Sequence, residues 1–242
     1  MAADFPAKAM ILAAGRGNRL RPLTDQVPKC MVPIGRKPLL EYTIERFAFH
    51  GVKEIVMNLH HLPDTIMDHF QDGQRWGVKI TYSMERELLG TAGGVRNVAS
   101  FFDGPFIVWY GDNLSRCDLN RMWRFHSDHC AVGTIALFER EEVSQSGIVG
   151  IDSDGRIERF HEKPHGTQVF SNLVNAGIYI FDRGVFDWIP KTGASDFAAE
   201  VFPLMLSNQQ PLFGYRLSRE ENLWWIDRPE DLSRVEHEWE LQ

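Results

Sequence analysis

The stretch that decides the fold is Met10-Ile11-Leu12-Ala13-Ala14-Gly15-Arg16-Gly17-Asn18-Arg19-Leu20-Arg21-Pro22-Leu23-Thr24, followed by Pro28-Lys29. Its apolar part, residues 9–14, predicts a buried strand that ends abruptly at glycines and arginines. A strand that opens into a glycine-rich basic loop is how α/β proteins hold phosphates, because glycine lets backbone N–H groups approach the phosphate oxygens. Close cations repel one another, so we expect an anion as their partner. These cations are Arg16, Arg19, Arg21 and Lys29.

The loop does not fit two common nucleotide-binding motifs. The dinucleotide fingerprint requires a third glycine where Leu20 stands, and no Gly-Lys-Ser/Thr of a P-loop follows. A nicotinamide-binding oxidoreductase is therefore a poor candidate. A merely solvated loop is also disfavoured, because closely spaced glycines seldom follow so apolar a strand.

Composition limits the possible classes of protein. The 242 residues suit one large domain, and 43% apolar residues suffice for a sizeable core. The net charge of −7 argues against a general nucleic-acid binder. On an acidic protein, the basic loop predicts a discrete anion site rather than a broad basic surface.

The cysteines and the N-terminus favour a cytoplasmic protein. Cys30, Cys117 and Cys130 are odd in number and widely spaced, so neither a disulfide framework nor a metal cluster is expected. Residues 1–8 do not resemble a signal peptide, and no apolar run approaches the roughly 20 residues that span a bilayer. We therefore expect no membrane partner.

Strands and helices alternate in the first half, which is typical of a parallel sheet with right-handed crossovers. Pro38 opens a helix that Gly51 ends, and Asp64 and Asp118 cap two further helices. Further strands are expected at residues 54–59, 78–83 and 106–110, and a glycine-rich turn at 90–94 before a helix toward residue 101. The strand 106–110 places Gly111-Asp112-Asn113 at the carboxyl edge, where such sheets bind ligands.

The pattern becomes strand-rich in the second half. Strands are expected at residues 132–138, 148–152, 157–161, 174–181 and 212–217, and helices at 197–206 and 229–239. Asp154-Gly155 predicts a hairpin turn. We therefore expect a mixed sheet, whose later strands build the second half of a binding pocket.

Several ordered motifs together resemble one family, the sugar-1-phosphate nucleotidylyltransferases. They are Gly15-x-Gly17-x-Arg19-Leu20-x-Pro22-Leu23-Thr24, Pro28-Lys29, Lys37-Pro38-Leu39, Glu85-x-Glu87-x-Leu89-Gly90-Thr91-Ala92-Gly93, Gly111-Asp112-Asn113, Phe160-His161-Glu162-Lys163-Pro164, Val174-Asn175-Ala176-Gly177-Ile178-Tyr179 and Trp225-Ile226-Asp227. The resemblance implies an α/β, three-layer Rossmann-like nucleotide-diphospho-sugar transferase fold with a mixed central sheet. It implies one nucleotidyltransferase domain over residues 1–242, with a nucleotide-binding half at about 1–115, a sugar-phosphate-binding half at about 116–242, and no C-terminal β-helix.

The family resemblance implies a Mg²⁺-dependent transferase of nucleotide-sugar biosynthesis that uses an NTP and a sugar-1-phosphate. Arg19, Lys29 and Asp112 would be catalytic. Nucleotide-binding residues would be Leu12, Ala13, Ala14, Gly15, Gly17, Asn18, Arg19, Lys29, Glu85, Gly90 and Thr91. Sugar-phosphate-binding residues would be Asn113, Gly147, Glu162, Lys163 and Asn175. A homo-oligomer is possible within this family.

Asp112 and Asp227 would be the Mg²⁺ ligands, since Mg²⁺ takes one or two carboxylates together with substrate phosphates. The sequence departs from the family pattern after Asp227. Gly-Thr usually stands before Pro-Glu-Asp there, whereas Arg228 leads directly to Pro229. We expect that Arg228 could pair with Asp227 and weaken the metal site.

The substrates stay open at this point. Residues 169–180 are most similar to mannose-1-phosphate guanylyltransferases, Asp112-Asn113 to glucose-1-phosphate thymidylyltransferases, and Ala13-Ala14-Gly15 to N-acetylmuramate-1-phosphate uridylyltransferases. Heptose-1-phosphate guanylyltransferases and phosphocholine cytidylyltransferases also fit the length. GTP with mannose-1-phosphate is the preferred pair, with UTP-, dTTP- and CTP-using relatives as alternatives. A catalytically silent ligand-sensing or regulatory subunit is a further alternative, favoured by the altered loop after Asp227.

Two pairs of histidines have spacings that a metal site could use. His60 and His61 are adjacent, and His126 and His129 are three residues apart on an expected helix. Such residues are more often exposed or satisfied by core hydrogen bonds, and we expect that outcome for both pairs.

Overall fold

The computed structural model describes residues 4–226 and 228–240. The chain divides into two compact units. The parallel unit comprises residues 7–88, 109–116 and 223–242, and the antiparallel unit comprises residues 1–6, 89–108 and 117–222. Both kinds of strand pairing occur, so the fold is mixed α/β with a central mixed sheet, as predicted.

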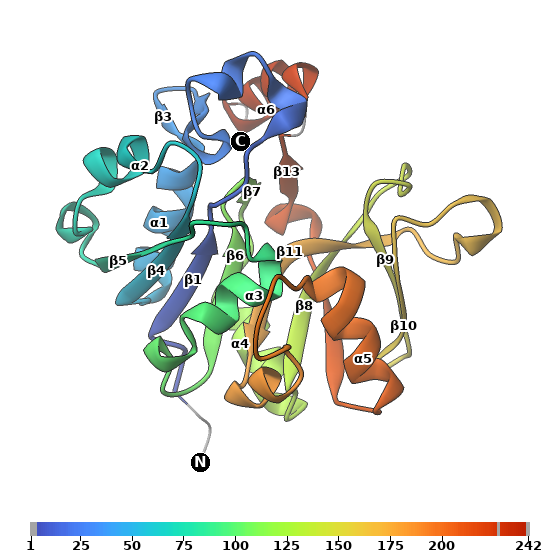
Figure 1. Cartoon of the computed structure of the whole chain (residues 1–242). Helices are drawn as coiled ribbons and strands as arrows, with labels where there is room; N and C mark the ends of the chain where they lie inside the picture. Colours follow the sequence, from blue (N-terminus) through green and yellow to red (C-terminus); the bar gives the residue numbers. More distant parts are fainter. Residues whose placement is uncertain (1–3, 227, 241–242) are drawn as a thin grey trace. The chain divides into compact units, whose positions relative to one another are not determined.

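Three parallel strands form the framework of the parallel unit (Figure 1). β4 (Glu54–Leu59) pairs with β1 (Lys8–Leu12) on one side and with β5 (Lys79–Met84) on the other. Each strand lies within two residues of its predicted range. The last two residues of β6 (Phe106–Tyr110) also belong to this unit.

Two helices follow the first and second strands. α1 (Leu39–His50) begins after Pro38 and ends at Gly51, whose φ of 95° is a left-handed conformation that glycine accepts readily. Its Phe47 packs edge-on against Trp109 at 5.6 Å. α2 (Pro63–Phe70) has Leu62, not Asp64, at its N-cap. The predicted Asp64 cap is wrong, because Pro63 already fills the first helical position.

Short pairings complete the parallel unit. β2 (Pro33–Ile34) pairs with β3 (Lys37–Pro38), and β7 (Asn113–Ser115) pairs with β13 (Leu223–Trp225), all outside the sequence predictions. α6 (Pro229–Glu240) begins where the Arg228 amide donates to the Asp231 carboxylate, at 2.9 Å.

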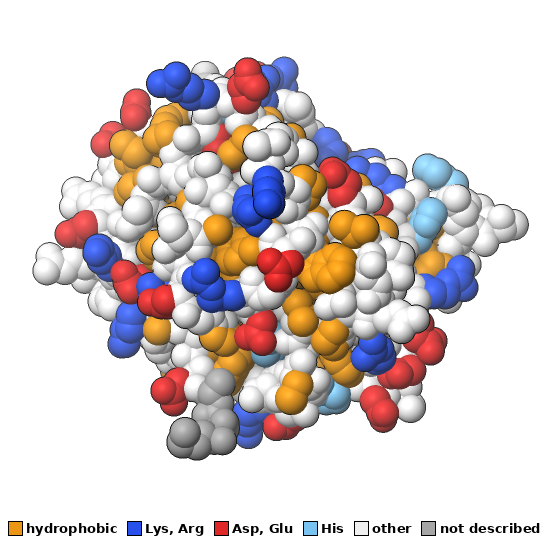
Figure 2. Space-filling model, turned by 60° about the horizontal axis from the view of Figure 1, so that its bottom comes forward, with side chains coloured by type: hydrophobic (Ala, Val, Ile, Leu, Met, Phe, Trp, Pro, Cys, Tyr) orange, Lys and Arg blue, Asp and Glu red, His pale blue; other side chains and the backbone are white. Residues whose placement is uncertain are grey.

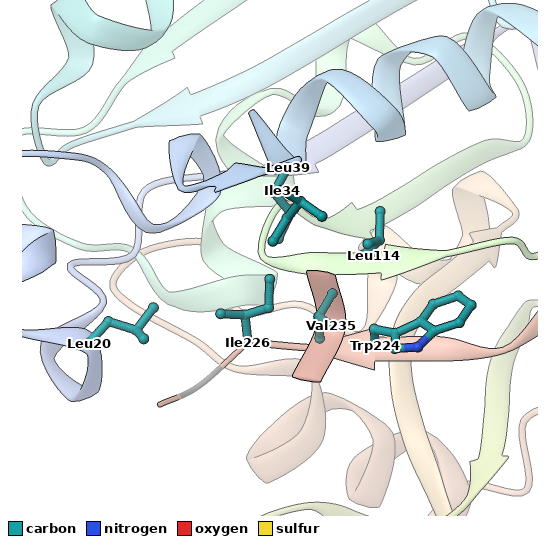
Figure 3. Packing of buried hydrophobic residues seen from close by; sticks show 7 residues of the cluster. All are labelled: Leu20, Ile34, Leu39, Leu114, Trp224, Ile226 and Val235. Atoms are coloured by element: carbon teal, nitrogen blue, oxygen red, sulfur yellow. The ribbon is translucent and has the colours of Figure 1, made fainter. Parts of the chain in front are cut away.

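One apolar cluster joins all three segments of the parallel unit (Figure 3). Its buried members are Leu20, Ile34, Leu39, Leu114, Trp224, Ile226 and Val235. Burying a side chain of this size contributes about 1.5–3 kcal/mol. The glycine-rich loop is therefore anchored through Leu20 to the C-terminal segment of the chain.

The antiparallel unit contains five strands of its own. They are β8 (Gly133–Glu139), β9 (Gly147–Ile151), β10 (Ile157–Glu162), β11 (Leu173–Phe181) and β12 (Leu212–Arg216). β11 pairs antiparallel with β8 and β9, and β9 pairs antiparallel with β10 across the predicted turn at Asp154-Gly155. β12 runs parallel to β8. The predicted change to a mixed sheet is confirmed.

Three helices belong to the antiparallel unit: α3 (Gly90–Asn97), α4 (Leu119–Asp128) and α5 (Phe202–Ser207). The glycine-rich turn predicted at 90–94 is wrong, since α3 begins at Gly90 and contains these glycines. The helix predicted at 197–206 is a π-helical turn, Phe197–Val201, that continues into α5. The 3₁₀ turns of both units are Asn18–Leu20, Leu23–Asp25, Lys29–Met31, Gln74–Trp76, Ala99–Phe101, Gly166–Gln168, Arg183–Asp187 and Arg219–Glu221.

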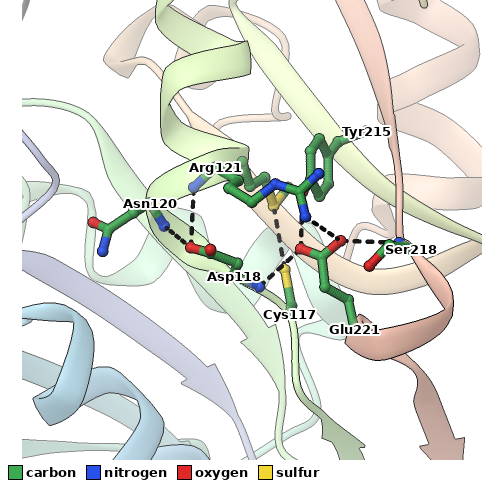
Figure 4. A network of polar contacts seen from close by, with 8 residues as sticks. Cys117, Asp118, Asn120, Arg121, Tyr215, Ser218 and Glu221 are labelled. Atoms are coloured by element: carbon green, nitrogen blue, oxygen red, sulfur yellow. Dashed lines mark hydrogen bonds and ion pairs between the residues drawn. The ribbon is translucent and has the colours of Figure 1, made fainter.

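A polar network fixes the start of α4 (Figure 4). The Asp118 side chain accepts hydrogen bonds from the amides of Asn120 and Arg121, which confirms the predicted cap. The buried Glu221 carboxylate accepts from the Asp118 amide at 3.0 Å and from the Tyr215 hydroxyl at 2.8 Å. These hydrogen bonds offset the cost of burying the Glu221 carboxylate, which therefore has a structural role.

Acidic and basic side chains are interspersed on the face drawn in Figure 2, and no broad patch of one sign shows among its described residues. Within the described part of the chain, every helix is too short or too polar to cross a membrane.

Candidate functional site

Lys29 and Asp112 form the centre of the predicted site in the parallel unit. Lys29 begins a 3₁₀ turn, and Asp112 lies two residues after the end of β6. Lys29 Nζ lies 2.5 Å from Asp112 Oδ2. The Gly111 amide donates to the Leu12 carbonyl at 2.9 Å, which fixes Asp112 beside the end of β1. A compact cation and a carboxylate are thus brought together at the carboxyl ends of these strands.

Gly17 packs directly on Lys29. Its φ is 62°, and a Cβ there would lie 2.9 Å from Lys29 Cβ, which is too close. The Thr24 hydroxyl donates to the Gly17 carbonyl at 2.9 Å, and His61 Nε2 bonds the Thr24 carbonyl at 2.8 Å. The loop conformation therefore depends on glycine at position 17 and is held from two sides.

The rest of the predicted phosphate loop presents both buried and exposed groups. Ala13 and Ala14 are buried, and Leu12 is half-buried at the end of β1. Gly15, Asn18 and Arg19 are exposed, and a 3₁₀ turn begins at Asn18. The backbone around Gly15 is open, since a Cβ there would meet no other atom within 4 Å. The exposed part of the loop can therefore receive an anionic ligand.

Asn58 is the buried residue that the sequence predictions missed. Its Oδ1 accepts from the Ala13 amide at 2.8 Å, and its Nδ2 donates to Glu85 Oε1 at 2.8 Å. Asn58 and Glu85 are only 3% and 6% exposed. A signal was present, because Asn58 is a single amide within the otherwise apolar end of the strand 54–59.

His60 links the same region to Arg16. Arg16 Nη2 lies 3.2 Å from His60 Nε2, and His60 Nδ1 lies 3.0 Å from the Glu85 carbonyl. Arginine can only donate, so Nε2 accepts and the proton is on Nδ1. His60 thus bridges the loop and the segment after β5.

Glu162 and Gly147 face each other in the antiparallel unit, where β10 pairs with β9. A Cβ on Gly147 would lie 2.7 Å from Glu162 Oε2, so glycine leaves the space that the carboxylate fills. Burial raises the pKa of Glu162, and Asp196 adds to this, while Lys163 opposes it. The structure therefore keeps a partly desolvated carboxyl at the predicted sugar position.

Lys163 and Asn175 complete this predicted group. Lys163 has a φ of 49°, its amide donates to the Ser146 carbonyl, and its Nζ lies 3.9 Å from Glu162 Oε1. Its side chain is 60% exposed. Asn175 Nδ2 donates to the Tyr179 hydroxyl at 2.8 Å. Lys163 thus lies beside the Glu162 carboxyl directly after β10, and Asn175 lies on β11 of the same unit.

Gly90 and Thr91 begin α3 and contact the segment before residue 197. A Cβ on Gly90 would lie 2.4 Å from the Ser195 carbonyl oxygen, and its φ is 74°. The Thr91 hydroxyl donates to Asp196 at 2.9 Å and accepts from the Phe197 amide at 2.9 Å. The close approach of Ser195 explains why position 90 is glycine, and the two hydrogen bonds explain why position 91 carries a hydroxyl. The role of both residues in nucleotide binding stays a prediction.

The predicted metal ligands can be followed only in part. Asp227 lies outside the described residues, and so does its expected pairing with Arg228. Asn113 is buried in β7. The described residues contain no group of three or more His, Cys, Asp or Glu side chains placed to hold a metal. The donor chemistry of Asp112, a partly exposed carboxylate, nevertheless fits Mg²⁺, because Mg²⁺ takes few protein ligands and keeps waters and substrate phosphates.

The histidines of both pairs make hydrogen bonds, as expected. His126 bonds the Thr134 hydroxyl at 2.9 Å, and burial lowers its pKa to about 4. His129 Nδ1 bonds the Phe125 carbonyl at 2.8 Å. All three cysteines are free. Burial, with a smaller effect of Asp112, raises the pKa of Cys30 to about 12, so this thiol stays neutral beside Lys29.

Comparison with known proteins identifies the class. The model of the nucleotidyl transferase family matches residues 8–232, and the chain belongs to this family. It is 38% identical over 234 residues to a UTP–glucose-1-phosphate uridylyltransferase of Synechocystis, covering 91% of this chain and 59% of that protein. It is 36% identical over 232 residues to a mannose-1-phosphate guanyltransferase of Schizosaccharomyces pombe, covering 93% and 62%. The chain thus spans about three fifths of the length of these curated relatives.

A solved structure supports the fold. A putative glucose-1-phosphate thymidylyltransferase from Bacillus anthracis matches with a TM-score of 0.83 at 22% identity, over 95% of this chain and 94% of that chain. At this identity the likeness is one of fold.

Proposed function

We propose that the chain transfers a nucleotidyl group from an NTP to a sugar-1-phosphate, giving a nucleoside-diphosphate sugar and pyrophosphate. The observation that carries this proposal is the contact of Lys29 with Asp112 beneath the glycine loop, with Nζ 2.5 Å from Oδ2. Membership of the nucleotidyl transferase family supports the same reaction class.

This reaction requires the protein to neutralise negative charge and does not require it to transfer a proton. A phosphate oxygen of the sugar-1-phosphate attacks the α-phosphorus of the NTP, forming a P–O bond. The bond from the α-phosphorus to the bridging oxygen breaks, and pyrophosphate leaves with that electron pair. The nucleophile is already an anion, so no strong base is required. The protein must bring two anions together and neutralise them.

The parallel unit would bind the nucleotide. The loop from Gly15 to Arg19 would hold the triphosphate, with Arg19 on the leaving pyrophosphate. Lys29 would meet the phosphates near the reacting α-phosphorus, where a compact ammonium suits a group whose geometry changes. Lys29 is already held in place before any substrate binds, because Gly17 packs on it.

The antiparallel unit would bind the sugar-1-phosphate. Glu162 would accept hydrogen bonds from sugar hydroxyls, and Lys163 would meet the phosphate. Asn175 and Gly147 would line the sugar. The partly desolvated Glu162 supports this assignment, because displaced water leaves a carboxyl ready to accept from a polar ligand.

Mg²⁺ is the proposed cofactor, and Asp112 and Asp227 would hold it. When bound, Mg²⁺ would neutralise charge on the triphosphate and help orient it. Asp112 has two carboxylate oxygens, and Lys29 Nζ contacts one of them, Oδ2. In the absence of substrate, the Lys29 ammonium would balance the negative charge of Asp112.

GTP with mannose-1-phosphate is the proposed substrate pair. Glu85 would lie at the nucleobase, and a carboxylate only accepts hydrogen bonds. The guanine edge offers two neighbouring N–H donors, whereas uracil and thymine offer one N–H between two carbonyl oxygens. The guanyltransferase relative is consistent with this choice. The uridylyltransferase relative supports the alternative, UTP with glucose-1-phosphate.

The test is pyrophosphate release with Mg²⁺ across GTP, UTP, dTTP, CTP and ATP, each with a panel of sugar-1-phosphates and phosphocholine. We expect one preferred pair, with GTP and mannose-1-phosphate the fastest. Turnover of another pair would correct the substrates and keep the reaction class. Nucleotide binding without any turnover would contradict the proposal and favour a ligand-sensing subunit.

A further inference from the structure

Three parallel strands of the parallel unit end at one edge, and the central one carries Asn58. β4 lies between β1 and β5, and Asn58 is paired with Leu12 on one side and with Ser83 on the other. Ala13 directly follows β1, and Glu85 directly follows β5. A side chain at the end of β4 can therefore reach both neighbouring strand ends, and Asn58 does so.

The two hydrogen bonds of Asn58 use different atoms of one amide. Oδ1 accepts from the Ala13 amide and Nδ2 donates to Glu85, each at 2.8 Å. The asparagine amide offers an acceptor and a donor in one planar group, and a carboxylate can only accept. The bonds are buried, so an unpaired group left here costs more than one at the surface.

We propose that Asn58 is a positioning residue that ties the phosphate loop to Glu85 and so fixes the distance between the groups that hold the two ends of the nucleotide. This inference rests on the proposed function, in which Ala13 begins the triphosphate loop and Glu85 lies at the base. The bridge through His60, from Arg16 to the Glu85 carbonyl, connects the same two segments from outside. Asn58 touches neither the reacting phosphorus nor the leaving group in this assignment, so it acts through its neighbours.

The test exchanges the amide and the carboxylate between the two positions. In N58D, two carboxylates face each other, and one of them must keep a proton or move away. In N58D/E85Q, the carboxylate at position 58 accepts from the Ala13 amide, and the amide at position 85 supplies the donor. Both hydrogen bonds are therefore restored, with the carboxylate now at position 58 and the amide at position 85. N208D, at an exposed position after α5, is the matched control for an Asn-to-Asp change.

We expect N58D to raise the KM for the NTP about tenfold or more, the range for losing a hydrogen bond to a charged group. The KM for the sugar-1-phosphate should change less than threefold, and N208D should resemble the wild type. Hydrogen exchange of the amides from Ala13 to Gly17 should accelerate in N58D. In N58D/E85Q, exchange should return toward the wild-type rate. E85Q and the double variant should share a base preference shifted away from GTP.

Two results would overturn the positioning role. One is a double variant whose loop amides exchange as fast as those of N58D. The other is an equal rise of both KM values in N58D. If the wild type turns over no nucleotide, the proposed function fails, and hydrogen exchange still decides whether Asn58 orders the loop. Unchanged base preference in E85Q would contradict the role of Glu85 at the base and, with it, the proposal that Asn58 fixes the distance between the two ends of the nucleotide.

Discussion

Lys29 and Lys163 are both predicted to meet a substrate phosphate, and the two units present them differently. The Lys29 side chain is 12% exposed and contacts Asp112, a residue far away in sequence. The Lys163 side chain is 60% exposed, and its nearest carboxylate, at 3.9 Å, belongs to its sequence neighbour Glu162. Immobilising a lysine side chain costs up to about 2 kcal/mol of conformational entropy. Folding has already ordered Lys29, whereas a ligand must still order Lys163.

This difference assigns the two units different tasks in the proposed reaction. A cation fixed before binding can stabilise charge that develops at the reacting centre, because no reorganisation is needed at that moment. A mobile cation is suited to capture and release of a ligand. We therefore expect substitutions in the parallel unit to lower kcat, and substitutions in the antiparallel unit to raise the KM for the sugar-1-phosphate.

The largest effect is expected for Asp112→Asn. An amide is a poorer Mg²⁺ ligand and replaces the carboxylate that Lys29 contacts, so kcat should fall about 10²- to 10³-fold. Pyrophosphate release over a range of Mg²⁺ concentrations measures this, with Tm as the check on folding. Asp187→Asn, at an exposed position, is the matched control. Near wild-type kcat for D112N at low Mg²⁺ would show that the metal assignment is wrong.

Lys163→Ala tests the other side of the comparison. Loss of a charge-assisted hydrogen bond to phosphate should raise the KM for the sugar-1-phosphate about tenfold or more. The KM for the NTP should change less than threefold. Lys191→Ala removes an exposed cation elsewhere in the same unit and serves as the control. An equal loss for both substrates would remove the distinction between the two lysines.

Gly17→Ala tests whether the backbone of the glycine loop holds Lys29 in place. A left-handed residue with a Cβ costs about 1–2 kcal/mol, and the contact with Lys29 Cβ adds strain, so Tm should fall by at least about 2–4 °C. Gly15→Ala is the matched control for stability, because its Cβ would point into open space. Equal Tm values for the two variants would mean that the loop adapts freely.

The smallest effect concerns Glu162→Gln. Burial raises the pKa of Glu162, so the folded state binds its proton more tightly than the unfolded state does. The stability that goes with the protonated form is present below the ordinary carboxyl pKa and is lost as pH rises through the raised value. E162Q should therefore unfold at a higher Tm than the wild type at neutral pH, and this gain should vanish in acid.

The same variant should bind the sugar-1-phosphate more weakly, since a neutral amide is a weaker acceptor. Thermal unfolding across pH and the KM for the sugar-1-phosphate measure the two effects. A Tm gain that does not depend on pH would show that ionisation of Glu162 is not its cause.

Periodicity and turn chemistry predicted most regular elements of the fold. The strand at 54–59 and the cap at Asp118 were predicted correctly, because both depend on local sequence. The helical state of residues 90–94 was missed, since their glycines favour turns locally. The Ser195 carbonyl accepts from the amides of Ala92 and Gly93 and so satisfies two N–H groups in the first turn of α3. Such a contact cannot be seen in a local window.

The site shows the same limit. The loop, Lys29 and Asp112 follow from a motif, and the structure adds that the last two are in contact. Asn58 was missed because its importance arises from partners at two other strand ends, Ala13 and Glu85. The pairing of β7 with β13 was missed because neither segment is long enough to show a period.

The apolar cluster that joins the three segments of the parallel unit bears on how the chain folds as it leaves the ribosome. Leu20 and Leu39 are synthesised early, whereas Trp224 and Val235 follow only after the entire antiparallel unit. The early apolar face therefore stays uncovered for most of translation. The strands of the antiparallel unit can pair in the meantime, and the contact of Leu20 with this cluster can be completed only after Trp224 has been synthesised. A nascent chain released before Trp224 would expose this face to chaperones and proteases.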